Sequence, residues 1–188
     1  MDSDVLIVGA GPVGGYLGKC LAEQGIHVIQ IEEHLEIGRP FQCAGLVTPS
    51  AMDKVGLHDT TLTDVWGARM HAPNGSSIEI GNPSQIREHV VCRKRFDEAV
   101  VRQAINAGVE LKLGTQITDA VLNDDHIAVT IRDEAGEQTL RTRLLCGADG
   151  AHSWVRSHAR LGRPPETMIG FQVEAIGYPG LDGILDMY

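Results

Sequence analysis

The stretch that decides the fold is Val5-Leu6-Ile7-Val8-Gly9-Ala10-Gly11-Pro12-Val13-Gly14, close to the start of the chain. An apolar run without alternation, such as residues 5–8, indicates a strand that is buried on both faces, as in a parallel sheet. Apolar residues at helical spacing follow over 12–24, and Gly25 stands where such a helix would end. A second strand over 27–31 completes a βαβ unit, whose crossover we expect to be right-handed.

Three glycines in this stretch, Gly9, Gly11 and Gly14, have the G-x-G-x-x-G spacing of a dinucleotide-binding loop. The first glycine permits a tight turn, the second lets the backbone approach a pyrophosphate, and the third lets helix and strand pack closely. Glu32 ends the second strand, near the ~20-residue distance at which an acid binds the ribose diol, and its charge repels the 2′-phosphate of NADP. The plain alternative is a glycine-rich turn that binds no ligand.

Composition narrows the class of protein. The 188 residues suit one large domain or two small ones, because domains average ~150 residues. A net charge of −9 argues against nucleic acid, since phosphate binding needs a positive field. The four cysteines form no C-x-x-C pair and the histidines show no ligand spacing, so we expect no metal site. No signal peptide or membrane span is visible, which predicts a cytoplasmic protein with reduced thiols and leaves peripheral membrane contact open.

The rest of the chain mixes helices with antiparallel strands. The turn Pro73-Asn74-Gly75 predicts a hairpin, and Thr48 and Gly108 stand where helices would begin and end. We expect a loop over 33–48, helices over 49–55, 93–107 and 153–159, and strands over 68–72, 77–80, 90–92, 109–113, 117–122, 127–131, 139–143, 144–148 and 168–176. Because this pattern stops after a strand, we expect the chain to be part of a longer fold.

Three motifs resemble those of FAD-dependent oxidoreductases of the glutathione-reductase-like superfamily. The glycine motif continues through Gly18, Leu21-Ala22, Gly25 and Val28 to Glu32. Arg93-Lys94-Arg95-Phe96-Asp97 resembles the R-x-x-F-D element of the hydroxylase-like branch, in which the arginine approaches the flavin. The run from Gly147 to Arg156 resembles that branch's G-A-D-G-x-x-S-x-V-R motif. Alternatively, Arg93 is a solvated charge, and Asp149 belongs to a turn or caps the helix after it.

The segment over 36–46, Glu-Ile-Gly-Arg-Pro-Phe-Gln-Cys-Ala-Gly-Leu, resembles the P-x-x-C-(G/A)-x-G loop of geranylgeranyl reductases, which lies beside the flavin ring. The resemblance makes Cys43 the candidate catalytic residue; the alternative is a cysteine that packs as a small hydrophobe. The loop is one residue shorter than in some members. The resemblance implies cofactor contacts at Gly9, Gly11, Pro12, Gly14, Glu32, Glu33, Cys43, Ala44, Gly45, Arg93, Ile117 and Asp149.

The fold that the resemblance implies is α/β, a Rossmann-type FAD-binding βαβ core with antiparallel strands that begin a substrate-binding layer. We expect an FAD-binding domain over 1–66 and 88–160, and the start of a substrate-binding domain over 67–87 and 161–188. The family's second flavin motif and the aromatic element of its lipid cavity are absent from the chain. We therefore expect the 188 residues alone to bind FAD weakly.

The function that the resemblance implies is reduction of the C=C bonds of geranylgeranyl chains in membrane-lipid biosynthesis. The partners would be an isoprenoid lipid and an external electron donor: NADPH, a deazaflavin or ferredoxin. Two alternatives stay open. An aromatic or quinone-pathway monooxygenase shares the other motifs but generally lacks the cysteine loop, and a truncated flavin-binding fragment would have no activity.

Overall fold

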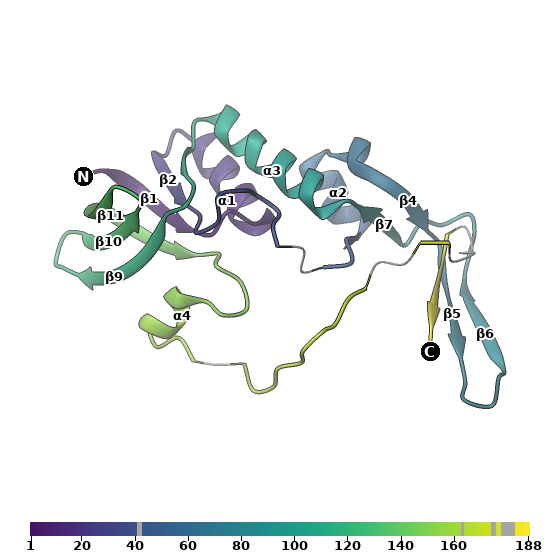
Figure 1. Ribbon diagram of the computed structural model, residues 1–188. Helices are drawn as coiled ribbons and strands as arrows, with labels where there is room; N and C mark the ends of the chain where they lie inside the picture. The colour runs from purple at the N-terminus through teal and green to yellow at the C-terminus, as the bar shows by residue number, and fades with distance from the viewer. Residues whose placement is uncertain (41–42, 163, 174–175, 178–182) are drawn as a thin grey trace. The chain divides into compact units, whose positions relative to one another are not determined.

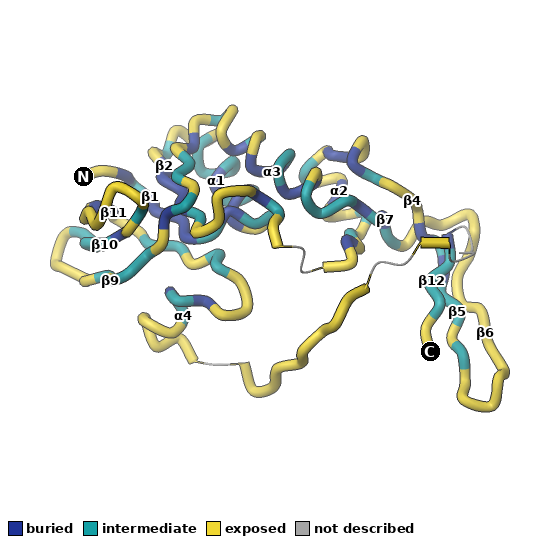
Figure 2. The backbone as a smooth tube through the Cα atoms, in the orientation of Figure 1, coloured by how far each residue is buried: buried dark blue, intermediate teal, exposed yellow. Residues whose placement is uncertain are grey.

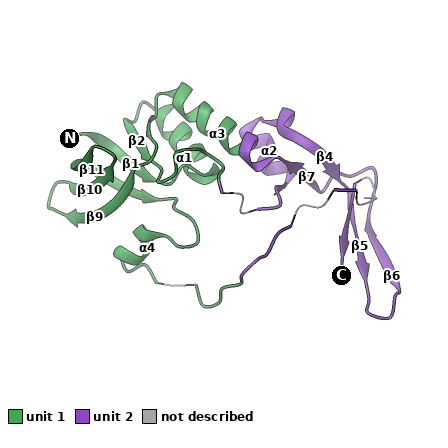
Figure 3. Cartoon of the chain, viewed as in Figure 1, with its two compact units in different colours: residues 1–39, 97–168 green, residues 40–96, 169–188 purple. Residues whose placement is uncertain are grey.

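The computed structural model describes residues 1–40, 43–162, 164–173, 176–177 and 183–188 (Figure 1). The chain divides into two compact units that exchange at three points in the sequence, one of which falls within a helix. Unit 1 comprises Met1–Arg39 and Asp97–Met168, and unit 2 comprises Pro40–Phe96 and Ile169–Tyr188 (Figure 3). The predicted domain bounds lie elsewhere in the sequence, and the assignment of FAD-binding and substrate-binding domains stays a prediction.

Unit 1 is built on a six-stranded mixed sheet in the order β8-β2-β1-β11-β10-β9. The pairs β8–β2, β2–β1 and β1–β11 are parallel, whereas β11–β10 and β10–β9 are antiparallel. The predicted α/β class, with a Rossmann-type core and antiparallel strands, is thereby confirmed. The strands are β1 (Ser3–Val8), β2 (Val28–Ile31), β8 (Glu110–Lys112), β9 (Gln116–Leu122), β10 (Ile127–Asp133) and β11 (Gly136–Gly147).

Both faces of this sheet are buried at its centre (Figure 2). Leu6 and Val8 of β1 belong to one hydrophobic cluster, and Val5 and Ile7 belong to another. Leu17 of helix α1 (Pro12–Ala22) packs against the second cluster, to which helix α3 (Arg93–Ala107) contributes Ala104. Burial on both faces is why β1 reads as an unbroken apolar run.

The long strand β11 corrects one prediction, because residues 139–143 and 144–148 were expected to form two strands. Thr142 pairs with Ile127 of β10 and also with Ser3 of β1. Before Thr142 the neighbour of β11 is β10, and after it the neighbour is β1. The sequence pattern changes at this position because the environment of the strand changes there, while the strand itself continues.

Unit 2 contains two small sheets, with strand orders β3-β7-β4 and β12-β5-β6. The predicted hairpin is confirmed as the antiparallel pair β5–β6. The predicted helix over 49–55 is α2 (Pro49–Val55), in which the Thr48 side chain accepts a hydrogen bond from Ala51 N and Gly56 ends the helix with a φ of +67°. The other elements are β3 (Leu46–Val47), η1 (His58–Thr60), β4 (Thr61–Val65), β5 (Gly67–His71), β6 (Ser77–Gly81), β7 (Glu88–Val91) and β12 (Ile184–Met187).

The prediction of a strand over 168–176 is wrong for the residues of this range that the structure describes. Met168, Ile169 and Phe171 are almost fully exposed and belong to no strand, and residues 174–175 lie outside the described residues. An alternating pattern becomes a strand only when a neighbouring strand offers its hydrogen-bonding edge. In unit 2 the edge of β5 is taken by β12, which the sequence analysis did not predict.

Candidate functional site

The turn between β1 and α1 requires glycine at two positions for steric reasons. Gly9 has a φ of +99°, and a Cβ placed on it would lie 2.5 Å from the carbonyl oxygen of Ala148. A Cβ on Gly14 would lie 2.1 Å from the carbonyl oxygen of Gly9. Any side chain at either position would therefore displace backbone atoms, so both glycines are needed for the turn and for the packing of helix on strand.

The N-terminus of α1 is open, and this distinguishes Gly11 from the other two glycines. Apart from Gly11 and its two chain neighbours, no atom of the described residues lies within 4 Å of a Cβ placed on Gly11. Gly11 is the N-cap residue, no side chain of the described chain caps the helix, and Pro12 occupies the first turn without any acidic neighbour there. Pro12 has no N–H and Gly15 N donates to Gly11 O, so the N–H groups between them are the ones available to an anion, which the helix dipole also favours.

The carboxylate of Glu32 is held against the glycine turn. Its Oε2 accepts a hydrogen bond from Ala10 N at 2.8 Å, and its Oε1 accepts one from His34 N at 3.0 Å. The ring nitrogen Nδ1 of His34 lies 2.6 Å from the same Oε1. Only 14% of the Glu32 side chain is exposed, so the acid is ordered before any ligand arrives.

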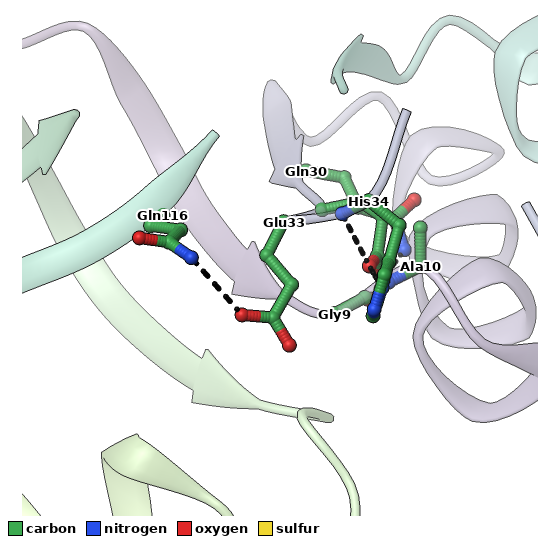
Figure 4. Close-up of polar contacts among 7 residues, drawn as sticks. Gly9, Ala10, Gln30, Glu33, His34 and Gln116 are labelled. Atoms are coloured by element: carbon green, nitrogen blue, oxygen red, sulfur yellow. Dashed lines mark hydrogen bonds and ion pairs between the residues drawn. The ribbon is translucent and has the colours of Figure 1, made fainter. Parts of the chain in front are cut away.

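Glu33 points to a different part of unit 1 (Figure 4). Gln116 Nε2 donates to Glu33 Oε2 at 3.4 Å, and both residues are exposed. The neighbour of Gln116 in β9, Ile117, is half-buried against the core cluster. The structure therefore brings Glu33 close to the segment that contains Ile117, although their predicted contacts with a cofactor stay predictions.

Asp149 holds the start of α4 (Trp154–His158). Its Oδ1 accepts from the Ser153 hydroxyl at 2.6 Å, and its Oδ2 accepts from Val155 N at 3.1 Å. Ser153 in turn accepts from Arg156 N as the N-cap of this short helix. The alternative interpretation of Asp149, as a residue that caps the following helix, thus describes its contacts, and its role toward a cofactor stays a prediction.

The predicted residues of unit 2 lie in the segment that leads into β3 and at the start of α3. Gly45 has a φ of +84°, and a Cβ on it would lie 2.2 Å from the carbonyl oxygen of Val91. Cys43 and Ala44 are exposed, and Cys43 Sγ accepts a hydrogen bond from Gly45 N at 3.5 Å. Arg93 is half-buried as the first residue of α3. Phe41 and Gln42 of the predicted cysteine loop lie outside the described residues.

Sequence reasoning missed two residues that contact this site, Gln30 and His34. Gln30 Nε2 donates to the carbonyl oxygen of Gly9 at 2.9 Å (Figure 4). The available signal was a polar residue inside a run of buried apolar ones in β2. His34 carried no such signal, because a histidine after a strand is ordinarily a solvated loop residue.

These observations fit an adenine dinucleotide. The open approach at Gly11 and the uncapped helix end suit a pyrophosphate, and the ordered Glu32 carboxylate suits a ribose diol. In the described part of the chain, no three His, Cys, Asp or Glu side chains are grouped to hold a metal ion. Nor does any helix there have the length and apolar character needed to cross a membrane.

Comparison with known proteins identifies the family. The model of a family described as FAD binding domain matches residues 2–176. The chain belongs to this FAD binding domain family. The predicted cofactor, FAD, is therefore confirmed, and membership accounts for the glycine turn, the open helix end and the ordered acid of unit 1.

Curated relatives share one name, digeranylgeranylglycerophospholipid reductase. The digeranylgeranylglycerophospholipid reductase of Methanosarcina acetivorans is 34% identical over 157 residues, which cover 81% of this chain and 39% of that protein. Digeranylgeranylglycerophospholipid reductase 2 of Methanopyrus kandleri is 31% identical over 184 residues, which cover 94% of this chain and 46% of that protein. The resemblance to geranylgeranyl reductases is thus confirmed, and the chain spans less than half the length of these relatives.

A solved structure supports the fold. The geranylgeranyl bacteriochlorophyll reductase-like protein of Thermoplasma acidophilum superposes with a TM-score of 0.70 at 23% identity, covering 79% of this chain and 39% of that one. This likeness confirms the fold of the chain.

Proposed function

We propose that the full protein is an FAD-dependent oxidoreductase that reduces the C=C bonds of geranylgeranyl chains in membrane-lipid biosynthesis. The observation that carries the proposal is the similarity, over 94% of the chain, to a relative named for this reaction. The cysteine loop around Cys43 supports it further, because monooxygenases with the same glycine and arginine motifs generally lack that loop.

In this proposal unit 1 holds the dinucleotide part of FAD. The Gly11 backbone and the N-terminus of α1, begun by Pro12, bind the pyrophosphate. Each carboxylate oxygen has two lone pairs, and Glu32 Oε2 uses one for Ala10 N, so the other can accept from a ribose hydroxyl. We assign further cofactor contacts to Gly9, Gly14, Glu33, Ile117 and Asp149.

The residues of unit 2 act in this proposal at the flavin and the substrate. Bound FAD in its reduced form supplies the hydride chemistry. We propose that Ala44, Gly45 and Arg93 contact the flavin and that Cys43 is the catalytic residue. The Gly45 N–H, which donates to Cys43 Sγ, would stabilise the thiolate that is left when the Cys43 S–H gives its proton to the substrate carbon.

The remaining partners follow from the substrate class. An isoprenoid lipid requires access to a membrane surface, so we propose a cytoplasmic protein with peripheral membrane contact. Electrons would come from an external donor, which is NADPH, a deazaflavin or ferredoxin.

The test is a reduction assay with the full-length protein. FAD-loaded protein is reduced without oxygen by dithionite and mixed with a digeranylgeranyl glycerophospholipid, and the lipid is then analysed by mass spectrometry. We expect products that have gained two hydrogens for each saturated double bond. The matched control is Gly11→Leu, whose side chain would occupy the approach of the pyrophosphate. Oxygen consumption with NADPH and a phenol, without lipid saturation, would instead favour the monooxygenase.

A further inference from the structure

Both polar groups of one peptide bond in the glycine turn are held by side chains, one from β2 and one from the residue that follows it. Gln30 Nε2 donates to Gly9 O at 2.9 Å, and Glu32 Oε2 accepts from Ala10 N at 2.8 Å. The Gly9 carbonyl and the Ala10 N–H belong to the same Gly9–Ala10 peptide group. Because Gln30 and Glu32 are two positions apart in an extended segment, both side chains project to the same side and reach the same peptide.

Gln30 is an unfavourable residue for the place that it occupies. It is fully buried within β2, where its neighbours Ile29 and Ile31 are apolar and also buried. Its Oε1 is buried and has no hydrogen-bond partner among the described residues. An unsatisfied buried carbonyl opposes folding, and an apolar side chain of the same length would avoid that penalty. What Gln30 adds to the structure is therefore its hydrogen bond to Gly9 O.

The glycines of α1 make room for this amide. A Cβ on Gly14 would lie 2.9 Å from Gln30 Nε2, and a Cβ on Gly18 would lie 3.4 Å from Gln30 Oε1. The Gln30 amide therefore fills the space that the missing side chain of Gly14 leaves beside the Gly9 carbonyl.

We propose that Gln30 is a positioning residue of the FAD site, which fixes the orientation of the Gly9–Ala10 peptide. A rotated peptide would direct the Gly9 carbonyl toward the Glu32 carboxylate and the Ala10 N–H toward the Gln30 amide donor, and both contacts repel. Without Gln30, the peptide keeps the Glu32 bond and loses the second of these two side-chain restraints, so the turn spends part of its time in orientations that receive the pyrophosphate poorly. The proposal rests on the FAD site of the proposed function and not on the lipid.

The test compares Gln30→Met with a surface control, Gln138→Met, in the full-length protein. Methionine keeps the length of glutamine but offers no donor, and Gln138 is exposed on β11. For Gln30→Met we expect the FAD dissociation constant, measured by flavin fluorescence, to rise about tenfold. The melting temperature of the FAD-free protein should change little, because removal of the unpartnered Oε1 offsets the loss of the hydrogen bond to Gly9 O. Hydrogen exchange at the Ala10 amide should become faster in the FAD-free protein. Gln138→Met should leave all three measurements unchanged.

A second variant distinguishes the loss of the hydrogen-bond donor at position 30 from the change in the shape of the side chain. In Gln30→Glu the buried carboxyl stays protonated and can donate to Gly9 O, so FAD affinity should recover relative to Gln30→Met. Wild-type FAD affinity and wild-type Ala10 exchange in Gln30→Met would overturn the proposal. So would a loss of affinity that only follows a loss of stability, since Gln30 would then be structural. A protein that binds FAD but saturates no isoprenoid would refute the proposed function and leave this inference standing.

Discussion

The substitution Gly14→Ala measures how tightly α1 packs on the glycine turn. The added Cβ would lie 2.1 Å from the Gly9 carbonyl oxygen, where ordinary contact begins at 3.4 Å. It would also lie 2.9 Å from Gln30 Nε2 and 3.2 Å from the Ala148 Cβ, so nearby atoms on three sides must shift. Overpacking that moves backbone costs roughly 3 kcal/mol or more, and the better helix propensity of alanine returns about 1 kcal/mol.

We therefore expect the free energy of unfolding of FAD-free Gly14→Ala to fall by roughly 2–3 kcal/mol, and its melting temperature by about 5–10 °C. The matched control is Gly11→Ala, whose Cβ meets no described atom within 4 Å and whose φ of −73° suits alanine. The free energy of unfolding of the control should lie within about 1 kcal/mol of the wild-type value, yet the control should bind FAD at least tenfold more weakly. Urea unfolding followed by circular dichroism measures stability, and flavin fluorescence measures binding. Equal stability in the two variants would refute this account of the turn.

Three further predictions concern single side chains. Glu32→Gln keeps the shape but removes the charge and replaces one oxygen that accepts from Ala10 N or His34 N by an NH2 group. Calorimetry should therefore show FAD affinity lowered by ~1–3 kcal/mol, and unaltered affinity would argue against a role of Glu32 in binding. Cys43→Ser changes an exposed residue, so stability should hold within about 0.5 kcal/mol while turnover on the geranylgeranyl lipid falls; wild-type kinetics would remove Cys43 from the catalytic site. Burial raises the pKa of the Cys146 thiol, so its alkylation, followed by mass spectrometry, should begin at a more alkaline pH than that of an ordinary cysteine. The folded state then holds the Cys146 proton more tightly than the unfolded state, so the contribution of Cys146 to stability is present below its unfolded pKa and is lost as pH rises through its folded pKa. Alkylation of Cys146 at the pH of an ordinary cysteine would contradict the raised pKa.

Local sequence patterns predicted most of the helices and strands of unit 1. The helix predicted over 93–107 has those bounds, because its apolar spacing and Gly108 lie within the segment itself. The βαβ unit could also be predicted from the sequence, because burial of β1 on both faces leaves an unbroken apolar run.

Elements that depend on distant partners could not be predicted in this way. Strand β12 exists through its pairing with β5, more than 100 residues earlier in the chain, whereas the alternating segment at 168–173 has no strand partner among the described residues. Within the site, the glycine spacing indicated the turn, but the hydrogen bond from Gln30 to Gly9 depends on the register of β2 against β1, which periodicity does not encode.

Strand β1 meets its two neighbours at very different times during protein synthesis. Its pairing with β2 joins residues such as Val5 and Val28, which leave the ribosome almost together. Its other edge must wait for β11, and Ser3 and Thr142 are separated by 139 positions. At about 5–20 residues per second, that wait lasts roughly 7–28 seconds, during which an apolar strand edge stays unpaired while the intervening residues are made. The nascent chain is therefore most exposed to aggregation in this interval, and a chaperone that shields the β1 edge would have its greatest effect there.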